Sequence, residues 1–185
     1  NYFINPRFRG LGNGEAASLS PFNPGFNQVS TGYGAPSGVT GGTLALYNTS
    51  WGSLSNVYGP TFSVMPSTAY CFSMYFRTQP SETTNLTIVL TWLTENGTFI
   101  SDTTTNHTTT AGAWVRFHNG TTSPATAAYC RIMLIRNSGT AGTLIVINPM
   151  FEKGVTSPST YVDGDVTGYR YTGNPGTSVT VSSSA

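Results

Sequence analysis

Turn-forming residues interrupt this chain about every eight to twelve residues, and no segment keeps a helical hydrophobic period over three turns. Between the turns, short runs alternate apolar and polar side chains, which is the period of a half-buried strand. Asn96-Gly97 is a strong hairpin signal, because both residues tolerate the positive φ of a tight turn, and Asn119-Gly120 predicts another turn. The predicted strands cover residues 43–47, 58–64, 69–77, 86–94, 98–101, 114–118, 128–136 and 143–148, with a less regular one near 28–31. Short antiparallel strands in this number predict an all-β fold, an antiparallel β-sandwich or jelly roll, in one domain spanning residues 1–185.

The charge and composition of the chain exclude several functions. A net charge of +1 with only 8% charged residues lacks the basic excess that nucleic-acid binding requires. No apolar run approaches the roughly 18 residues needed to cross a bilayer, so we expect no membrane insertion. The 38% hydrophobic and 12% aromatic fractions argue against disorder. The chain begins at Asn1 without a charged, apolar leader, which favours an excised module or a processed product.

The two cysteines lie in predicted strands with opposite orientations. Alternation places Cys71 on the solvent side of its strand and Cys130 among the apolar, core-facing residues of another. Side chains that point to opposite faces cannot be bridged without distortion. The sequence therefore predicts two free thiols.

Residues that could carry catalysis are few and scattered. Most of the seven acidic residues lie beside turns, His107 falls in a predicted Thr-rich loop at residues 103–110, and His118 ends a predicted strand. No serine occupies a nucleophile elbow, and no His/Cys spacing suits zinc. We therefore predict a non-enzyme with no cofactor and no catalytic or zinc site. A structural calcium ion, held by Glu152 and backbone carbonyls, stays open, while Asp163-Gly-Asp165 lacks the ligand number of an EF-hand loop.

The outward positions of three predicted strands combine aromatic rings with arginines. Trp114 and Arg116 share the outer parity of one strand, Tyr75 and Arg77 that of a second, and Arg131 that of a third. If these strands belong to one sheet, rings that stack on the apolar face of a sugar lie among forked guanidinium donors for its hydroxyls or anionic groups. Such a surface is suited to binding saccharides.

Each aromatic residue also has a structural interpretation. Trp114 could cap the edge of the core, and Tyr75 could be an ordinary cross-strand packing residue. Trp92 shares its parity with Ile88 and Leu90, which predicts a core position. Trp51 lies in a polar loop without an obvious apolar partner, so it is a further candidate for ligand contact, although it could fold over the edge of the sandwich.

Several segments resemble, in order, jelly-roll carbohydrate-binding modules of the xylan- and β-glucan-binding type. Asn1-Tyr-Phe-Ile-Asn-Pro-Arg-Phe8 is similar to their opening, residues 66–77 to their "PGxxYxxSxYxR" strand, and Gly112-Ala-Trp-Val-Arg116 to their "G-x-W-x-R" strand. The ending, residues 150–154, 157–165 and 171–173, resembles that of such modules in tail proteins of long-tailed bacteriophages. Arg9 stands where the opening usually has the glutamate that helps to hold calcium in cellulolytic relatives, and Tyr171 replaces a tryptophan.

This resemblance implies a non-catalytic module that binds host cell-surface or cell-wall polysaccharide. It would be an accessory domain of a phage tail protein, located on the virion tail or an extracellular surface, with other tail proteins as partners. The expected ligand-binding residues are Trp51, Tyr75, Arg77, Trp114, Arg116 and Arg131. The alternative is a purely structural or oligomerising β-sandwich of a tail or adhesin protein.

Overall fold

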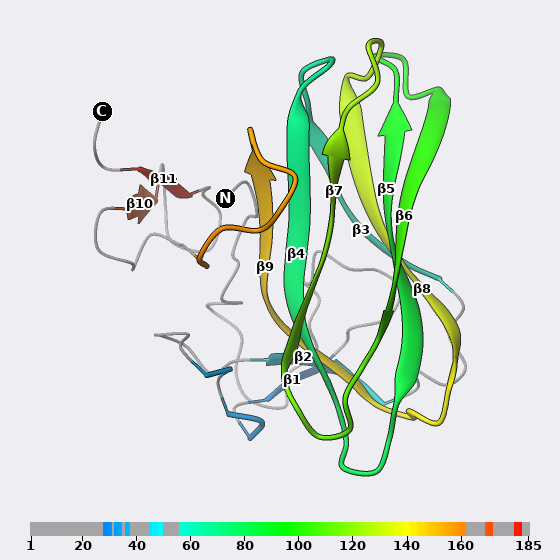
Figure 1. Ribbon diagram of the computed structural model, residues 1–185, viewed down its shortest axis with the longest axis vertical. Coiled ribbons are helices and arrows are strands. Elements are labelled where there is room, and N and C mark those ends of the chain that lie inside the picture. The colour runs from blue at the N-terminus through cyan, green and yellow to red at the C-terminus, as the bar shows by residue number, and fades with distance from the viewer. Residues whose placement is uncertain are drawn as a thin grey trace.

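A computed structural model describes residues 28–30, 32–34, 36–37, 45–49, 56–161, 169–171 and 180–182. Every regular element among these residues is a strand (Figure 1). The strands are β1 (Gln28–Ser30), β2 (Ala45–Asn48), β3 (Asn56–Ser63), β4 (Ala69–Thr78), β5 (Thr84–Leu93), β6 (Phe99–Thr108), β7 (Val115–Thr122), β8 (Tyr129–Gly139), β9 (Leu144–Lys153), β10 (Tyr169–Tyr171) and β11 (Thr180–Ser182).

Two antiparallel sheets form the body of the fold. The five-stranded sheet has the order β1-β2-β9-β4-β7, the four-stranded sheet has the order β3-β8-β5-β6, and β10 pairs with β11. Figure 1 shows the two larger sheets facing one another. From β2 to β9 the chain crosses from one sheet to the other at every connection except that between β5 and β6. The predicted all-β antiparallel sandwich is confirmed.

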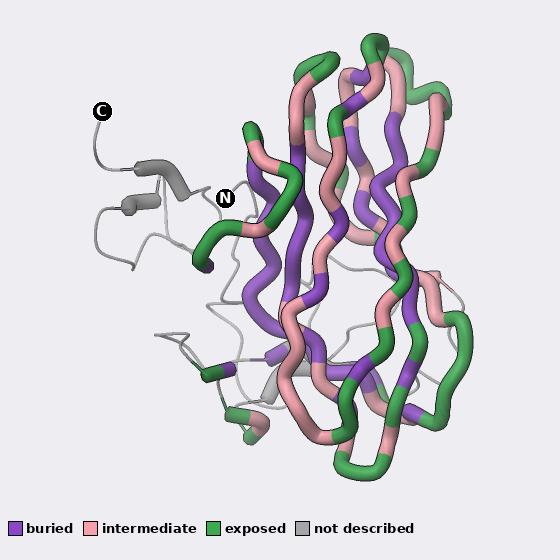
Figure 2. Tube along the Cα trace, viewed as in Figure 1, coloured by how far each residue is buried: buried purple, intermediate pink, exposed green. Residues whose placement is uncertain are grey.

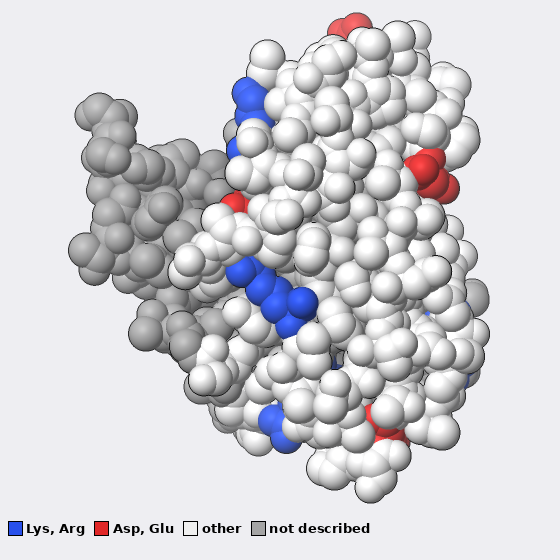
Figure 3. Space-filling view, viewed as in Figure 1, with Lys and Arg blue, Asp and Glu red and all other residues white. Residues whose placement is uncertain are grey.

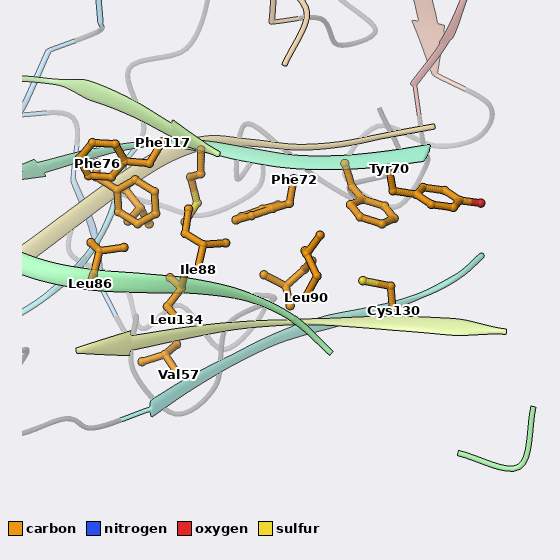
Figure 4. Close-up of a cluster of buried hydrophobic side chains, with 14 of the residues drawn as sticks. Val57, Tyr70, Phe72, Phe76, Leu86, Ile88, Leu90, Phe117, Cys130 and Leu134 are labelled. Atoms are coloured by element: carbon orange, nitrogen blue, oxygen red, sulfur yellow. The ribbon is translucent and has the colours of Figure 1, made fainter. Parts of the chain in front are cut away.

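The core lies between the two sheets and is built by strand alternation. Phe72, Met74 and Phe76 of β4 point inward, and the buried residues lie along the strand centres while the turns are exposed (Figure 2). Across the core, Ile88 and Leu90 of β5 meet them (Figure 4). The predictions for two further residues are confirmed, since Trp92 and Cys130 are both fully buried in this cluster.

Two segments that the sequence predicts as a loop and a turn belong to strands. Residues 103–108 continue β6 rather than forming a loop, because threonine favours strands even where no apolar alternation marks them. Asn119-Gly120 lies inside β7 and makes no turn. The buried Asn119 amide donates to the carbonyl oxygens of Ile88 at 2.9 Å and Thr103 at 2.7 Å, so it ties β7 of one sheet to β5 and β6 of the other.

Two prolines lie within strands, and each is accompanied by an irregularity in register. Pro60 lies in the edge strand β3, where the pairing with β8 shifts between Tyr58 and Thr61. Pro149 follows Asn148, which has a φ of 54°, where the pairing of β4 with β9 shifts. A bulge accommodates the missing N–H of proline, so β9 continues past its predicted end at residue 148 to Lys153.

Candidate functional site

Two aromatic–guanidinium pairs lie next to each other on the face of the five-stranded sheet turned away from the core, which we call the outer face. Tyr75 of β4 is in register with Arg116 of β7, and the Arg116 guanidinium carbon is 5.7 Å from the Tyr75 ring centroid. Two residues along β4, the Arg77 guanidinium carbon is 6.0 Å from the Trp114 ring centroid. All four side chains are half-buried. Four of the predicted binding residues are therefore neighbours, at distances typical of cation–π contacts.

The main chain of Tyr33 holds one of these pairs in place. Its carbonyl oxygen accepts a hydrogen bond from Arg77 Nη1 at 2.6 Å and another from Trp114 Nε1 at 3.3 Å. One carbonyl thus fixes both the guanidinium and the indole. The protein itself uses the indole N–H, and the Arg77 guanidinium lies over the ring.

Residues 155–161 form a strap that doubles back beside β9, the orange segment in Figure 1, and Ser159 anchors it. Arg116 Nη1 donates to the Ser159 carbonyl at 2.5 Å, and Arg116 Nη2 donates to Ser73 Oγ at 2.9 Å. The backbone N–H of Ser159 donates to Glu152 Oε2 at 3.2 Å, and its hydroxyl donates to Glu152 Oε1. An arginine and a carboxylate therefore clamp one serine from both sides.

Cys71 lies in the sheet beneath the strap, which corrects the prediction of a solvent-side thiol. Its position on the outer face is as predicted, but it is fully buried. Cys71 is in register with Gly120 of β7 and Glu152 of β9. A Cβ atom on Gly120 would lie only 2.1 Å from the Thr156 carbonyl oxygen, so the strap packs closely over these three residues. Burial, and secondarily the Glu152 charge, raise the pKa of Cys71 to about 12.

Both thiols are free, as predicted. Burial also raises the pKa of Cys130. Neither sulfur is therefore an activated nucleophile at neutral pH, because the thiolate is the reactive form.

The other two predicted binding residues do not join this face. Arg131 lies on β8 of the four-stranded sheet, so the assumption that its strand shares a sheet with β4 and β7 is wrong. Its guanidinium carbon is 5.3 Å from the Tyr58 ring centroid, on the opposite side of the sandwich from Arg116. Trp51 lies outside the described residues. Ligand contact by any of the six residues stays a prediction.

His107 is packed against a core phenylalanine and hydrogen-bonded to the backbone. The His107 ring stacks on Phe117 at a centroid distance of 4.5 Å and lies 2.9 Å from the His118 carbonyl oxygen through Nε2. Burial lowers the pKa of His107, which favours the neutral ring. Glu152 faces the strap on one sheet while Asp102 lies on the other, so these two carboxyls cannot act as a pair.

The part of the chain with a described structure also holds no group of three or more His, Cys, Asp or Glu residues that could bind a metal ion. Asp163 and Asp165 lie outside it. Within the same part, no helix is long and apolar enough to cross a membrane.

Charge on the visible surface is sparse and unevenly placed. Figure 3 shows a largely uncharged face on which Lys and Arg side chains follow the region of β4 and β9, while acidic groups lie mainly towards other edges. Two of the positive charges of this sheet, those of Arg77 and Arg116, lie next to aromatic rings.

Sequence reasoning missed three residues that shape these surfaces: Tyr33, Ser159 and Tyr58. The contacts of Tyr33 and Ser159 are made by the backbone, which carries no side-chain signal in the sequence. Tyr58 begins a predicted strand, and its outward parity with Thr61 is hidden by the bulge between them. An unusual Gly-Pro pair inside an alternating run is the signal that could have indicated the bulge.

Comparison with known proteins identifies the fold. No protein-family model matches the chain, and no curated protein matches it. In contrast, 74 solved chains match in structure. One is a family 22 carbohydrate-binding module of Clostridium thermocellum Xyn10B, with TM-score 0.53, 17% identity, and coverage of 85% of this chain and 97% of the module.

Two larger proteins contain the same fold as one part. An arabinose-bound α-L-arabinofuranosidase matches with TM-score 0.59 and 18% identity over 82% of this chain, and bacteriophage CBA120 tailspike protein 4 with TM-score 0.53 and 15% identity over 81%. This chain spans 26% of the arabinofuranosidase and 21% of the tailspike domain. At such identities the likeness establishes a shared β-sandwich fold.

Proposed function

We propose that this protein is a non-catalytic glycan-binding module whose ligand lies on the outer face of the five-stranded sheet. The observation that carries the proposal is the adjacency of the Tyr75–Arg116 and Arg77–Trp114 pairs on that face. Aromatic faces stack on the apolar C–H surface of a sugar ring, and the arginines orient those rings while adding local positive charge. The structural likeness to a family 22 carbohydrate-binding module supports the same assignment.

The recognition chemistry is expected to be dominated by the rings. Hydrogen-bond donors of Arg77, Arg116 and Trp114 already serve the Tyr33 and Ser159 carbonyls. Few contacts must then offset the cost of ordering a ligand, so single-site dissociation constants on the order of 10 µM to 1 mM are expected. Several copies on one particle would supply avidity.

We further propose a setting for the module, as an accessory domain of a phage tail protein that recognises host cell-surface saccharide, on a virion tail. The supporting observations are the ordered motifs at residues 150–165 and the fold likeness to a tailspike protein, of which this chain spans 21%. Host polysaccharide and other tail proteins would then be its partners.

The test is a pull-down of the tagged chain on a panel of bacterial cells and purified polysaccharides, with free sugars as competitors. Tyr75→Ala and Trp114→Ala should each abolish saturable binding, whereas Phe99→Ala, which removes an exposed aromatic far from this face, should not. Thermal unfolding of each variant shows whether it is folded.

Absence of binding to every polysaccharide, at a valency high enough to capture millimolar sites, would overturn the proposal. A stable homo-oligomer that buries Tyr75 and Trp114, measured by light scattering, would favour the structural module instead.

A further inference from the structure

The outward side of the four-stranded sheet carries an aromatic–guanidinium pair of its own. Tyr58 of β3 is 41% exposed, and the Arg131 guanidinium carbon of β8 is 5.3 Å from its ring centroid. Register places Thr61 and Thr91 on either side of Arg131, and Met133 opposite Tyr58. Hydroxyl groups and apolar atoms therefore surround one positive charge on this sheet face.

A bulge in the edge strand brings this pair together. The pairing of β3 with β8 shifts between Tyr58 and Thr61, where Gly59 and Pro60 intervene. Bulges bend the strand and re-aim a side chain, which accounts for a ring lying against a residue that is not its direct register partner. Because Pro60 lacks an N–H, the same bulge also blocks pairing of this edge with another strand.

Arg131 differs from the two arginines of the other sheet in how its donors are used. Arg77 and Arg116 donate to backbone carbonyls. No hydrogen bond from Arg131 to another residue with a described position is found. Its buried Nε has no partner there, which is equally true of Arg116 Nε, so the difference lies in the outer guanidinium nitrogens. A partly buried guanidinium with unused donors is costly unless an acceptor reaches it, so its planar fork is open to an acceptor from outside.

We infer that Tyr58 and Arg131 form a second ligand site, which binds a sugar residue bearing a carboxylate. The guanidinium fork matches a carboxylate in a bidentate geometry, and the exposed tyrosine ring offers a stacking surface for the sugar. The exposed Thr61 provides a hydroxyl beside the same charge.

Among the described residues, the acidic side chain in register with this site is that of Asp102, and it does not oppose an anionic ligand strongly. Asp102 of β6 is in register with Thr91 of β5, and Arg131 of β8 is in register with Thr91 on the other side. Two strand spacings thus separate Asp102 from Arg131, roughly 9.6 Å, which exceeds the Debye length of about 8 Å at physiological salt. Repulsion between Asp102 and a ligand carboxylate bound at Arg131 is therefore largely screened.

The experiment titrates the full chain with trigalacturonic acid and, as an uncharged control of nearly the same size, with its methyl ester, while backbone amide NMR shifts are recorded. We expect saturable shifts centred on β3 and β8 with the acid, at least about tenfold weaker binding of the ester, and weakening as salt is raised. Arg131→Gln should cost at least about tenfold in affinity, Arg131→Lys less, and Tyr58→Ala should also weaken binding.

Phe99→Ala is the control, because it removes an exposed ring from β6, at the opposite edge of the same sheet from Tyr58, and should leave this titration unchanged. Equal binding of acid and ester, shifts confined to β4 and β7, or full affinity in Arg131→Gln would each overturn the inference. The two sites lie on opposite sheets, so failure here is distinguishable from failure of the proposed function.

Discussion

Removing the hydroxyl of Ser159 is expected to loosen the strap at residues 155–161 without unfolding the sandwich. Ser159→Ala deletes the hydrogen bond from Ser159 Oγ to Glu152 but keeps the backbone bond to the same carboxylate and the bond from Arg116 to the Ser159 carbonyl. The core between the two sheets contains neither the strap nor Ser159. The effect should therefore be local.

The size of the effect follows from the kind of bond that is lost. A hydrogen bond to a charged group contributes about 1.5–3 kcal/mol when shielded. Ser159 is exposed, so water competes for the hydrogen bond and reduces its contribution to about 1–2 kcal/mol. Since about 1.4 kcal/mol is a factor of ten in an equilibrium constant, the open fraction of the strap should rise roughly 5- to 30-fold.

Cys71 reports on this opening, because it lies beside Gly120 and Glu152 in the part of the sheet that the strap covers. In the closed state its pKa is about 12, so labelling by a thiol reagent at pH 8 must proceed through open states, in which the pKa returns towards 9.0. The labelling rate then follows the open population. Ser159→Thr, which keeps a hydroxyl, is the matched control, and Cys130 is an internal one because it is buried in the core.

The expected result is a 5- to 30-fold faster modification of Cys71 in Ser159→Ala, with Cys130 unchanged. An unchanged Cys71 rate would show that the strap does not protect this thiol. Equal acceleration of both thiols would show global rather than local opening, and either outcome would refute the reasoning.

Three further outcomes concern the body of the fold. Asn119→Ala should lower the free energy of unfolding in urea by about 1–3 kcal/mol, because it removes two hydrogen bonds that join the sheets, one of them fully buried. A loss below about 0.5 kcal/mol would contradict the inter-sheet role. Burial lowers the pKa of His107, so as pH falls the unfolded chain binds a proton at this ring before the folded chain does. The free energy of unfolding should therefore fall below about pH 6.5, and His107→Gln should flatten that slope. Because the pKa values of Cys71 and Cys130 are raised, the unfolded thiols lose their protons first, so stability should fall as pH rises above about 9, less steeply in Cys71→Ser; a flat alkaline profile would contradict this.

Local patterns in the sequence predict the strands and the core well. Phe72, Met74 and Trp92 alternate with polar neighbours, and alternation alone decides which side chains face inward. The sequence pattern predicts strand β6 only as far as residue 101, whereas the strand continues to Thr108, because the run of threonines around His107 has no apolar alternation.

Which sheet a strand joins, and which loop covers it, cannot be deduced from local patterns. Arg131 has the outward parity predicted for it, but its strand pairs with β3 and β5 rather than with β4. Cys71 likewise has the predicted parity, yet residues about 85 positions later in the chain bury it. Both errors come from long-range pairing that strand periodicity does not encode.

Glycan binding on the outer face of the five-stranded sheet is tested most directly through the tryptophan indole signals of the full chain. Trp114 donates its indole N–H to the Tyr33 carbonyl beside the proposed ligand, whereas Trp92 donates to Thr103 Oγ1 and is fully buried in the core. With tryptophan labelled by ¹⁵N, a saccharide selected by the pull-down is added until binding saturates. The account predicts that the Trp114 indole signal shifts saturably while the Trp92 signal stays in place. Saturable binding that leaves the Trp114 signal unmoved would contradict it.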